Sequence, residues 1–264
     1  MTTPSLAGKV IAVIGGTTGL GFSAARAFVH AGARVVVVGR SADSAAAAGA
    51  ELGAAAQVVV GDAAQSETSQ RAVACAVEVF GRLDGLYHVA GGSGRRMGDG
   101  PLHELTDEGW HATVELNLTS LVYSNRAAVR QFLAQGGGGV LLNMGSVLGR
   151  SPSPHFFATH GYAATKSAVI GFTRSIASYY AGSNIRANVI APALVETPMA
   201  RRAAGDETIR AFIRTKQPLD GGRIGHPTDC DGAAVYFLSD ASAFVTGQVL
   251  AVDGGWSVSE GQIP

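Results

Sequence analysis

Short apolar runs rich in β-branched residues recur along the whole chain, and most are followed by a longer Ala-rich segment. Continuous apolar runs of this length are typical of strands buried on both faces, whereas a strand with one exposed face alternates apolar and polar residues. We expect strands at 10–14, 34–38, 57–60, 85–90, 139–143, 185–190 and 248–252. Because such strands need cover on both sides, the pattern predicts a parallel sheet between two layers of helices.

The Ala-rich segments carry apolar residues at helical spacing. We expect helices at 21–30, 70–80, 107–133, 162–180 and 228–238, a shorter one at 207–214, and a further helix and a loop at the simple runs 45–48 and 136–139. No linker, charge block or repeat interrupts the alternation. The chain is therefore predicted to be one doubly wound α/β domain over 1–264, a Rossmann fold of about seven strands. The long connection at 193–217 is expected to be a substrate lid.

Composition argues against several classes of partner. Lys plus Arg and Asp plus Glu both number 20, so no net charge attracts nucleic acid or an anionic membrane. Residues 1–8 lack a targeting pattern, and no apolar stretch reaches the roughly 18 residues of a membrane span. Cys75 and Cys230 lack the spacing of a metal site or a disulfide framework. We expect a cytoplasmic protein without a metal, a nucleic-acid partner or a membrane anchor.

A glycine-rich turn follows the first expected strand and opens the first helix. Glycine permits unusual backbone angles and close approach of a ligand, while the N–H groups and dipole of a helix N-terminus attract phosphate. A turn that needs glycine for packing alone is the alternative, but the strand–turn–helix context favours the pyrophosphate of a dinucleotide. The residues expected to line it are Gly15, Thr17, Thr18, Gly19, Leu20 and Gly21.

The end of the second expected strand bears on the choice of dinucleotide. NAD sites often place a carboxylate there for the ribose hydroxyl, but this chain has Arg40. A guanidinium can hold the additional 2′-phosphate of NADP by charge-assisted hydrogen bonds. We therefore expect NADP, with NAD as the alternative if Arg40 is merely solvated and Asp43 binds the ribose.

Tyr162 and Lys166 are four positions apart in an expected helix and so share one face. Free Tyr has a pKa of about 10, too high for efficient proton exchange at neutral pH. A cation about 4 Å away, at an effective dielectric near 20, contributes roughly 4 kcal/mol, or about three pKa units, before desolvation is counted. Ser146 follows a strand at the carboxyl edge of the sheet, where its hydroxyl could bind the reacting oxygen. Taken alone, a Tyr and a Lys at this spacing are more often a pair on a helix surface, and a Ser after a strand is more often a turn residue or a cap.

Their order and context resemble the short-chain dehydrogenase/reductase family along essentially the whole chain. The motifs that carry the resemblance are Gly15-x-x-x-Gly19-x-Gly21, Asp62, Ala90-Gly91, Asn117, Ser146, Tyr162-x-x-x-Lys166, Pro192 with Thr197, and Asp253-Gly254-Gly255. The glycine spacing is similar to the compact branch of the family, and the C-terminal half to its 3-oxoacyl-carrier-protein and sugar or steroid reductases. The resemblance implies reversible hydride transfer between a nicotinamide cofactor and a small-molecule carbonyl or alcohol, in a homodimer or homotetramer.

The resemblance also implies roles for individual residues. Tyr162 would be the general acid/base, Ser146 would orient the substrate oxygen, and Lys166 would lower the Tyr pKa and bind ribose hydroxyls. Asn117 would hold a water for proton relay. The remaining cofactor contacts implied by the resemblance are Asp62 and Ala63 near the adenine, Ala90, Gly91 and Gly92 along the cofactor, and Pro192, Val195 and Thr197 near the nicotinamide.

The chain departs from the family pattern at a few positions. Ile14 stands where the family often has Thr, His88 and Val89 replace two Asn before Ala-Gly, and Ala193 replaces a common Gly. Local hydrogen bonds should therefore differ around the cofactor. The interval from Ser146 to Tyr162 is somewhat longer than usual, and its residues 153–157 are expected to shape the substrate entrance.

The sequence leaves the roles of four further charged or titratable residues undecided. His155 and His160 could carry protons, but a solvent-facing or pocket-wall role fits better because the Tyr–Lys pair already supplies the acid/base group. Arg95 and Arg96 could bind an anionic substrate, although surface solvation is the commoner role. A nicotinamide-binding sensor or scaffold with little turnover, and a reductase of conjugated C=C bonds, are the alternative functions. The substrate itself is not predicted.

Overall fold

The computed structural model describes residues 5–263, so residues 1–4 and 264, the two ends of the predicted domain, lie outside the described residues. One parallel sheet has the strand order β3-β2-β1-β4-β5-β6-β7. Its strands are β1 (Val10–Ile14), β2 (Arg34–Gly39), β3 (Ala56–Val60), β4 (Gly85–His88), β5 (Gly139–Met144), β6 (Ile185–Pro192) and β7 (Val249–Val252). The order reverses between β1 and β4, as in a doubly wound nucleotide-binding fold. The predicted fold class is confirmed.

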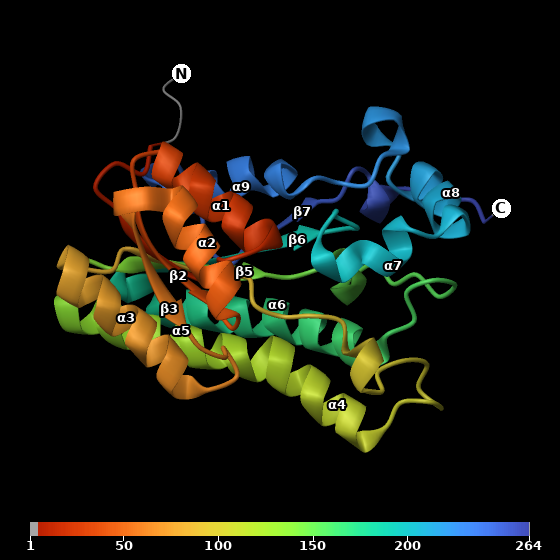
Figure 1. Ribbon diagram of the computed structural model, residues 1–264, viewed down its shortest axis with the longest axis horizontal. Coiled ribbons are helices and arrows are strands. Elements are labelled where there is room, and N and C mark those ends of the chain that lie inside the picture. Colours follow the sequence, from red (N-terminus) through yellow and green to blue (C-terminus); the bar gives the residue numbers. More distant parts are fainter. Residues whose placement is uncertain (1–4, 264) are drawn as a thin grey trace.

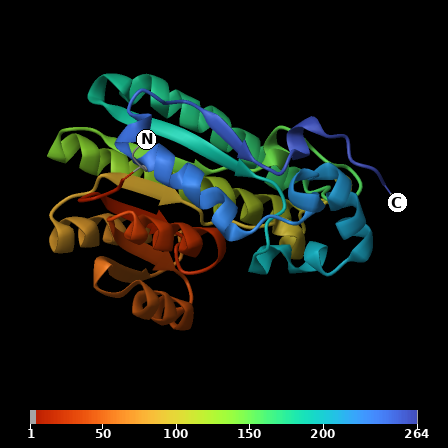
Figure 2. The ribbon, with the colours of Figure 1, turned by 90° about the horizontal axis from the view of Figure 1, so that it is seen from above.

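Helices cover both faces of this sheet (Figure 1). One layer contains α1 (Gly19–His30), α2 (Ala42–Leu52) and α9 (Asp231–Leu238), and the other contains α3 (Ser66–Phe80), α5 (Ser120–Gln135) and α6 (His160–Tyr180). Figures 1 and 2 place α7 (Arg201–Ala204) and α8 (Glu207–Lys216) beyond one end of the sheet, and α4 (Asp107–Val114) extends the line of α5 toward the same end. These shorter helices therefore surround the edge at which the strands terminate.

The core explains why the strands read as unbroken apolar runs. Every residue of β1 is buried. Ala12 packs in a cluster with Phe132 of α5, whereas its neighbour Val13 packs in a second cluster with Phe28 of α1. Because alternate side chains of β1 enter different cores, this strand is apolar on both faces.

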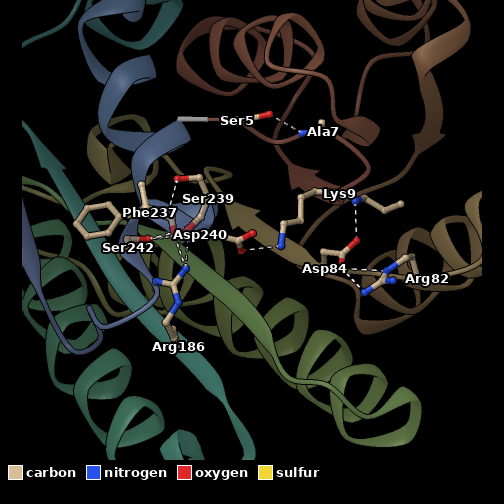
Figure 3. Close-up of polar contacts among 12 residues, drawn as sticks. Ser5, Ala7, Lys9, Arg82, Asp84, Arg186, Phe237, Ser239, Asp240 and Ser242 are labelled. Carbon is tan, nitrogen blue, oxygen red and sulfur yellow. Dashed lines mark hydrogen bonds and ion pairs between the residues drawn. The ribbon is translucent and has the colours of Figure 1, made fainter. Parts of the chain in front are cut away.

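Polar contacts at the amino-terminal ends of the strands are structural (Figure 3). Asp84 accepts hydrogen bonds from the backbone N–H of Val10 at 2.8 Å and from Nε of Arg82 at 2.9 Å. Lys9 forms an ion pair with Asp240 at 2.8 Å. Arg186 donates to the carbonyl oxygen of Phe237 at 2.8 Å. These side chains tie loops to strands, which leaves the opposite, carboxyl edge for a ligand.

Most helix and strand ends differ from the expected ones by a few residues, and two elements differ in a way that bears on the site. The expected strand 85–90 ends at His88, because the N–H groups of Val89 and Ala90 both turn to the carbonyl oxygen of Ile14, each at 2.8 Å. The expected helix 107–133 is divided by a π-helical turn at Glu115–Thr119. None of the described helices is long and apolar enough to cross a membrane.

Candidate active site

Four residues predicted to be catalytic meet at the carboxyl edge of the sheet. Ser146 lies just after β5, Tyr162 and Lys166 lie in the first two turns of α6, and Asn117 lies in the π-helical turn before α5. Ser146, Asn117 and Lys166 are all buried, and Tyr162 is partly exposed. A partly exposed residue among buried polar groups can meet a substrate while the groups that hold it stay ordered.

Lys166 is buried beneath this cluster, with 3% of its surface exposed. Its ammonium donates to the carbonyl oxygen of Met144 at 2.9 Å and lies 5.5 Å from the centroid of the Tyr162 ring. It has no carboxylate partner among the described residues, and burial lowers its pKa from 10.5 to about 8. Lys166 is therefore a buried ammonium with donor capacity left for a ligand hydroxyl.

The pKa of Tyr162 departs from the sequence-based argument. Burial raises it above its ordinary value of 10, and the Ser146 side chain, by hydrogen bonding, lowers it by less. The net shift is upward although the sequence predicted a lowering, because burial of the phenol outweighs the groups that favour its ionised form. Tyr162 therefore remains a protonated phenol at neutral pH, ready to act as an acid.

Asn117 holds the loop that follows β4. Its side-chain oxygen accepts from the N–H of Gly92 at 3.0 Å, and its amide nitrogen donates to the carbonyl oxygens of Gly92 and Thr113, both at 2.9 Å. The π-helical turn directs the amide to that loop, and such turns are frequent at functional sites. Both amide hydrogens are engaged, so a relay water would use the remaining acceptor capacity of Asn117.

The sequence-based reasoning missed Asp99. This residue is 5% exposed, and its two carboxylate oxygens accept from the N–H groups of Gly161 at 2.9 Å and Tyr162 at 2.8 Å. These are unpaired donors of the first turn of α6, whose preceding residue Thr159 makes no side-chain cap. Asp99 therefore fixes the backbone of the proton-donating residue from a different loop. No local motif could reveal a cap that is 63 residues away in sequence.

Asp99→Ala is expected to lower the free energy of unfolding by about 1–2 kcal/mol, because a helix cap is lost. We also expect kcat to fall about tenfold, since displaced reacting groups lose rate steeply. Asp99→Asn keeps one acceptor oxygen and should recover much of both losses. Urea titration and steady-state kinetics measure the two effects, with Asp107→Asn as a control at an exposed acid. An unchanged kcat in Asp99→Ala would confine this residue to stability.

The His88 ring also holds the loop that follows β4. The ring is 1% exposed and contacts Ser124 Oγ at 2.8 Å through Nδ1 and the carbonyl oxygen of Ala90 at 3.0 Å through Nε2. Burial and the nearby charge of Lys166 lower the pKa of His88 to about 3. A neutral ring can donate to Ala90 from Nε2 while Nδ1 accepts from the Ser124 hydroxyl. The departure from the family pattern at this position thus produces its own hydrogen-bond network.

The glycine turn has the geometry of a dinucleotide cradle. Gly15 has φ +85°, and a Cβ added there would lie 2.6 Å from the backbone nitrogen of Ala90. A Cβ at Gly21 would collide with the carbonyl oxygen of Gly15. Thr18 precedes α1 and makes no side-chain cap, so the first N–H groups of the helix can bind phosphate. Thr17 lies within this turn, and Leu20 lies in the first turn of α1.

The adenosine end of such a ligand would meet the ends of β2 and β3. Arg40 directly follows β2 and is exposed, without a carboxylate partner among the described residues. Asp62 follows β3, and its carboxylate accepts from the N–H of Ala64 at 3.0 Å, which orders the turn. Ala63 is buried beside it. The structure thus places Arg40, Asp62 and Ala63 at one edge of the sheet.

The nicotinamide end would meet the ends of β4 and β6. Gly91 is close to both catalytic amide and ammonium, because a Cβ there would lie 2.7 Å from Asn117 Oδ1 and 3.6 Å from Lys166 Nζ. Pro192 ends β6, and Val195 is buried three residues on. The methyl group of Thr197 would lie 3.5 Å from a Cβ on Gly19, so this segment borders the glycine turn. The residues present therefore fit a nicotinamide dinucleotide along its length.

Comparison with known proteins agrees with this geometry. A family model described as enoyl-(acyl carrier protein) reductase matches residues 15–257. The chain belongs to the short-chain dehydrogenase/reductase family. It is 32% identical to 3beta-hydroxysteroid dehydrogenase 2 of Eggerthella lenta over 96% of both chains. It is 34% identical to cis-4-hydroxycyclohexanecarboxylate dehydrogenase of Sinomonas cyclohexanicum over 96% of this chain and 98% of that one.

A solved short-chain dehydrogenase/reductase has the same fold. The structure of a short-chain type dehydrogenase/reductase from Mycobacterium ulcerans superposes with a TM-score of 0.89 at 33% identity, over 97% of this chain and 92% of that one. Family membership makes this short-chain dehydrogenase/reductase an oxidoreductase that uses NAD or NADP and transfers a hydride between the cofactor and a small-molecule carbonyl or alcohol. The predicted enzyme class is confirmed.

Aromatic packing joins the segment before α6 to α8 and the C-terminal region. The Phe156 ring lies 5.3 Å from that of Phe212, and the Phe157 ring lies 5.5 Å from that of Trp256, centroid to centroid. The indole N–H of Trp256 donates to the carbonyl oxygen of Ser151 at 3.1 Å. His155 and His160 are exposed. In this short-chain dehydrogenase/reductase, α8 is therefore packed on the segment that leads to Tyr162.

Proposed function

We propose that this chain is an NADP-dependent dehydrogenase/reductase acting reversibly on a secondary alcohol and its ketone. The observation that carries the proposal is the convergence of Ser146, Tyr162 and the buried Lys166 ammonium beside the glycine turn. Both relatives described above are named for alcohols carried on rings, which supports a secondary alcohol as the substrate class.

In the reducing direction, the protein handles one proton. The Tyr162 hydroxyl donates it to the carbonyl oxygen of the substrate, to which the Ser146 hydroxyl donates a hydrogen bond. The Lys166 ammonium stabilises the phenolate that Tyr162 becomes. A bound nicotinamide cofactor supplies the hydride when reduced and accepts it in the reverse direction. Asn117 keeps the loop at Gly92 in place and offers the acceptor for a relay water.

A substrate panel followed by NADPH absorbance at 340 nm tests the reaction. Cyclic ketones, their alcohols and matched enones are assayed side by side with NADPH and NADH, and with the oxidised cofactors for the alcohols. Turnover of ketones and alcohols, with products identified by mass, is the expected result. Turnover of enones to saturated ketones alone would replace ketone reduction by C=C reduction. Cofactor binding without turnover of any class would favour the sensor alternative.

The wild-type enzyme is expected to prefer NADP, and Arg40→Asp should raise the KM for NADP at least tenfold. Arg40 offers a guanidinium at the end of β2, and charge-assisted hydrogen bonds to a 2′-phosphate contribute roughly 1.5–3 kcal/mol each. NAD lacks that phosphate, so its KM should change little. Asp43→Asn serves as the matched control, because it would instead weaken NAD if Asp43 bound the ribose. A wild-type preference for NAD would overturn the cofactor assignment.

The remaining expectations concern the setting of the enzyme. We infer that 193–217, which includes α7 and α8, is a substrate lid, supported by its position beyond the strand ends (Figure 2). We also infer a homodimer or homotetramer in the cytoplasm. The edge strand β7 exposes Leu250, and Phe244 and Val258 near it are fully or almost fully exposed, which supports association at this edge. Light scattering after gel filtration, and cell fractionation, measure these two properties.

A further inference from the structure

Two arginines from different segments converge on one backbone oxygen, six residues before Tyr162 in the chain. Nη2 of Arg95, in the loop after β4, and Nη2 of Arg202, in α7, each lie 3.1 Å from the carbonyl oxygen of Phe156. Both arginine side chains are exposed. The three segments that meet here are the loop before α4, the segment before Tyr162 and the segment after β6.

Neither of these guanidinium groups is paired with a carboxylate among the described residues. A carbonyl oxygen is neutral, and neither arginine has a carboxylate within 4.0 Å among residues 5–263. Asp99 is the acid near Arg95, but both of its oxygens are engaged by the N–H groups of α6. Partial desolvation and the charge of Arg202 lower the pKa of Arg95. The two guanidinium groups therefore repel each other at a place where an anion would satisfy both.

The location links this pair to the catalytic residues. Arg95 belongs to the same short turn as Asp99, whose N–H donates to the carbonyl oxygen of Gly94 at 3.0 Å and whose carboxylate caps Tyr162. Phe156 is six residues before Tyr162 and packs against α8 through its ring. The Phe156 carbonyl oxygen, which accepts from both arginines, thus links the loop of Asp99 to α7, part of the expected substrate lid.

We propose that Arg95 and Arg202 form an anion-binding subsite that selects a carboxylate-bearing alcohol or ketone. This proposal rests on the proposed ketone/alcohol reaction and adds the class of its substrate. A carboxylate has two oxygens, so one substrate group can accept from both arginines and replace their repulsion by charge-assisted hydrogen bonds. The reactive carbon of the substrate would lie toward Tyr162, and its carboxylate would lie at the mouth of the site.

Binding of a non-reacting probe tests the subsite separately from turnover. Cyclohexanecarboxylate and the neutral cyclohexanecarboxamide are titrated calorimetrically into the full chain with saturating oxidised cofactor. The carboxylate is expected to bind at least tenfold more tightly than the amide, and its affinity should fall as ionic strength rises. Equal affinity for the two probes, or binding of neither, would overturn the subsite even if neutral ketones are turned over.

Kinetics on a matched pair then assign the residues. The pair is 4-oxocyclohexanecarboxylate and its methyl ester, assayed as kcat/KM. Arg95→Gln and Arg202→Gln should each lower the value for the acid about tenfold and leave the ester within about twofold. Arg96→Gln is the matched control, because Arg96 lies exposed in the same turn and makes no hydrogen bond to another described residue.

The possible outcomes distinguish an anion-binding role of the two arginines from a purely structural role. They also distinguish failure of the subsite from failure of the proposed reaction. Equal losses for acid and ester in both variants would mean that the arginines only hold the segments together, and would overturn the proposal. Selective binding of the carboxylate probe that Arg95→Gln and Arg202→Gln abolish supports the subsite even if the ketone pair is not turned over. In that case the proposed reaction fails while the inferred ligand class stands.

Discussion

Tyr162→Phe is expected to lower kcat about a thousandfold while leaving the Kd for the oxidised cofactor within about threefold. General acid/base catalysis contributes typically 10²–10⁴-fold, and this variant removes the hydroxyl that donates the proton. The phenylalanine ring keeps the packing over Lys166, whose ammonium lies 5.5 Å from the ring centroid. Steady-state NADPH absorbance gives kcat, and fluorescence titration gives the cofactor affinity.

Tyr179→Phe is the matched control for this prediction. Tyr179 lies on the same helix, α6, but is 81% exposed at its far end. Its loss should leave kcat unchanged. A Tyr162→Phe enzyme that kept a tenth or more of the wild-type kcat would show that another group supplies the proton, and the exposed His155 and His160 would be the next residues to replace.

Lys166→Met is expected to lower kcat/KM about a hundredfold at pH 7. At the 5.5 Å that separates Nζ from the ring centroid, an effective dielectric of about 20 gives roughly 3 kcal/mol of attraction for a phenolate at Tyr162. Each 1.36 kcal/mol is a factor of ten. Methionine fills similar volume without the charge, so the loss reports the ammonium and not a cavity. Thermal melting of the variant provides the check that it folds.

The pH dependence of the wild type follows from the same residue. Burial lowers the pKa of Lys166 to about 8, so its ammonium predominates below pH 8 and is lost as the pH rises through that value. The pKa of Tyr162 is raised, so this phenol stays protonated over the same window. Reduction should therefore decline in kcat/KM above about pH 8, and Lys166→Met should lack that limb. A wild-type profile that is flat from pH 7 to 9.5 would contradict this origin.

Whereas activity should fall above about pH 8, the contribution of Lys166 to the free energy of unfolding should rise with pH. The folded pKa of Lys166 lies below its ordinary value of 10.5, so between about pH 8 and 10.5 the unfolded chain binds more protons than the folded one. The contribution of this group to the free energy of unfolding therefore rises with pH across that window, and its burial opposes folding most below pH 8. Lys166→Met should remove this dependence, which urea titrations at pH 7 and 10 can measure.

The sheet could be predicted from the sequence because burial on two faces leaves a strong local signal. The run at 10–14 coincides with β1, and its neighbour β2 is also mostly apolar. The ends of the strands were harder to predict from the sequence. Val89 and Ala90 are apolar but leave the sheet, because their N–H groups are captured by Ile14 at the point where the chain makes room for a ligand.

In the candidate site, too, some features could be predicted from the sequence and others could not. The spacing of Tyr162 and Lys166 predicts a shared helical face, and the structure shows the ammonium over the ring. The direction of the Tyr162 pKa could not be predicted, since it depends on how deeply the phenol is buried and on the carbonyl oxygen that takes the Lys166 hydrogen bond. The Asp99 cap depends on contacts between distant segments, which local spacing does not encode.

Asp99 accepts two hydrogen bonds from the first turn of α6, so the loop before α4 and the catalytic helix are held together. An engineer who grafts a foreign loop between β4 and α4 to change selectivity would also release the backbone of Tyr162, so the graft would lower kcat as Asp99→Ala is expected to. Grafts should therefore end before Gly98 and retain Asp99, or should approach the substrate from α7, which makes no such bond to the helix N-terminus among the residues described. In this enzyme, selectivity and rate are therefore separable design targets wherever a graft leaves Asp99 and its two bonds to α6 in place.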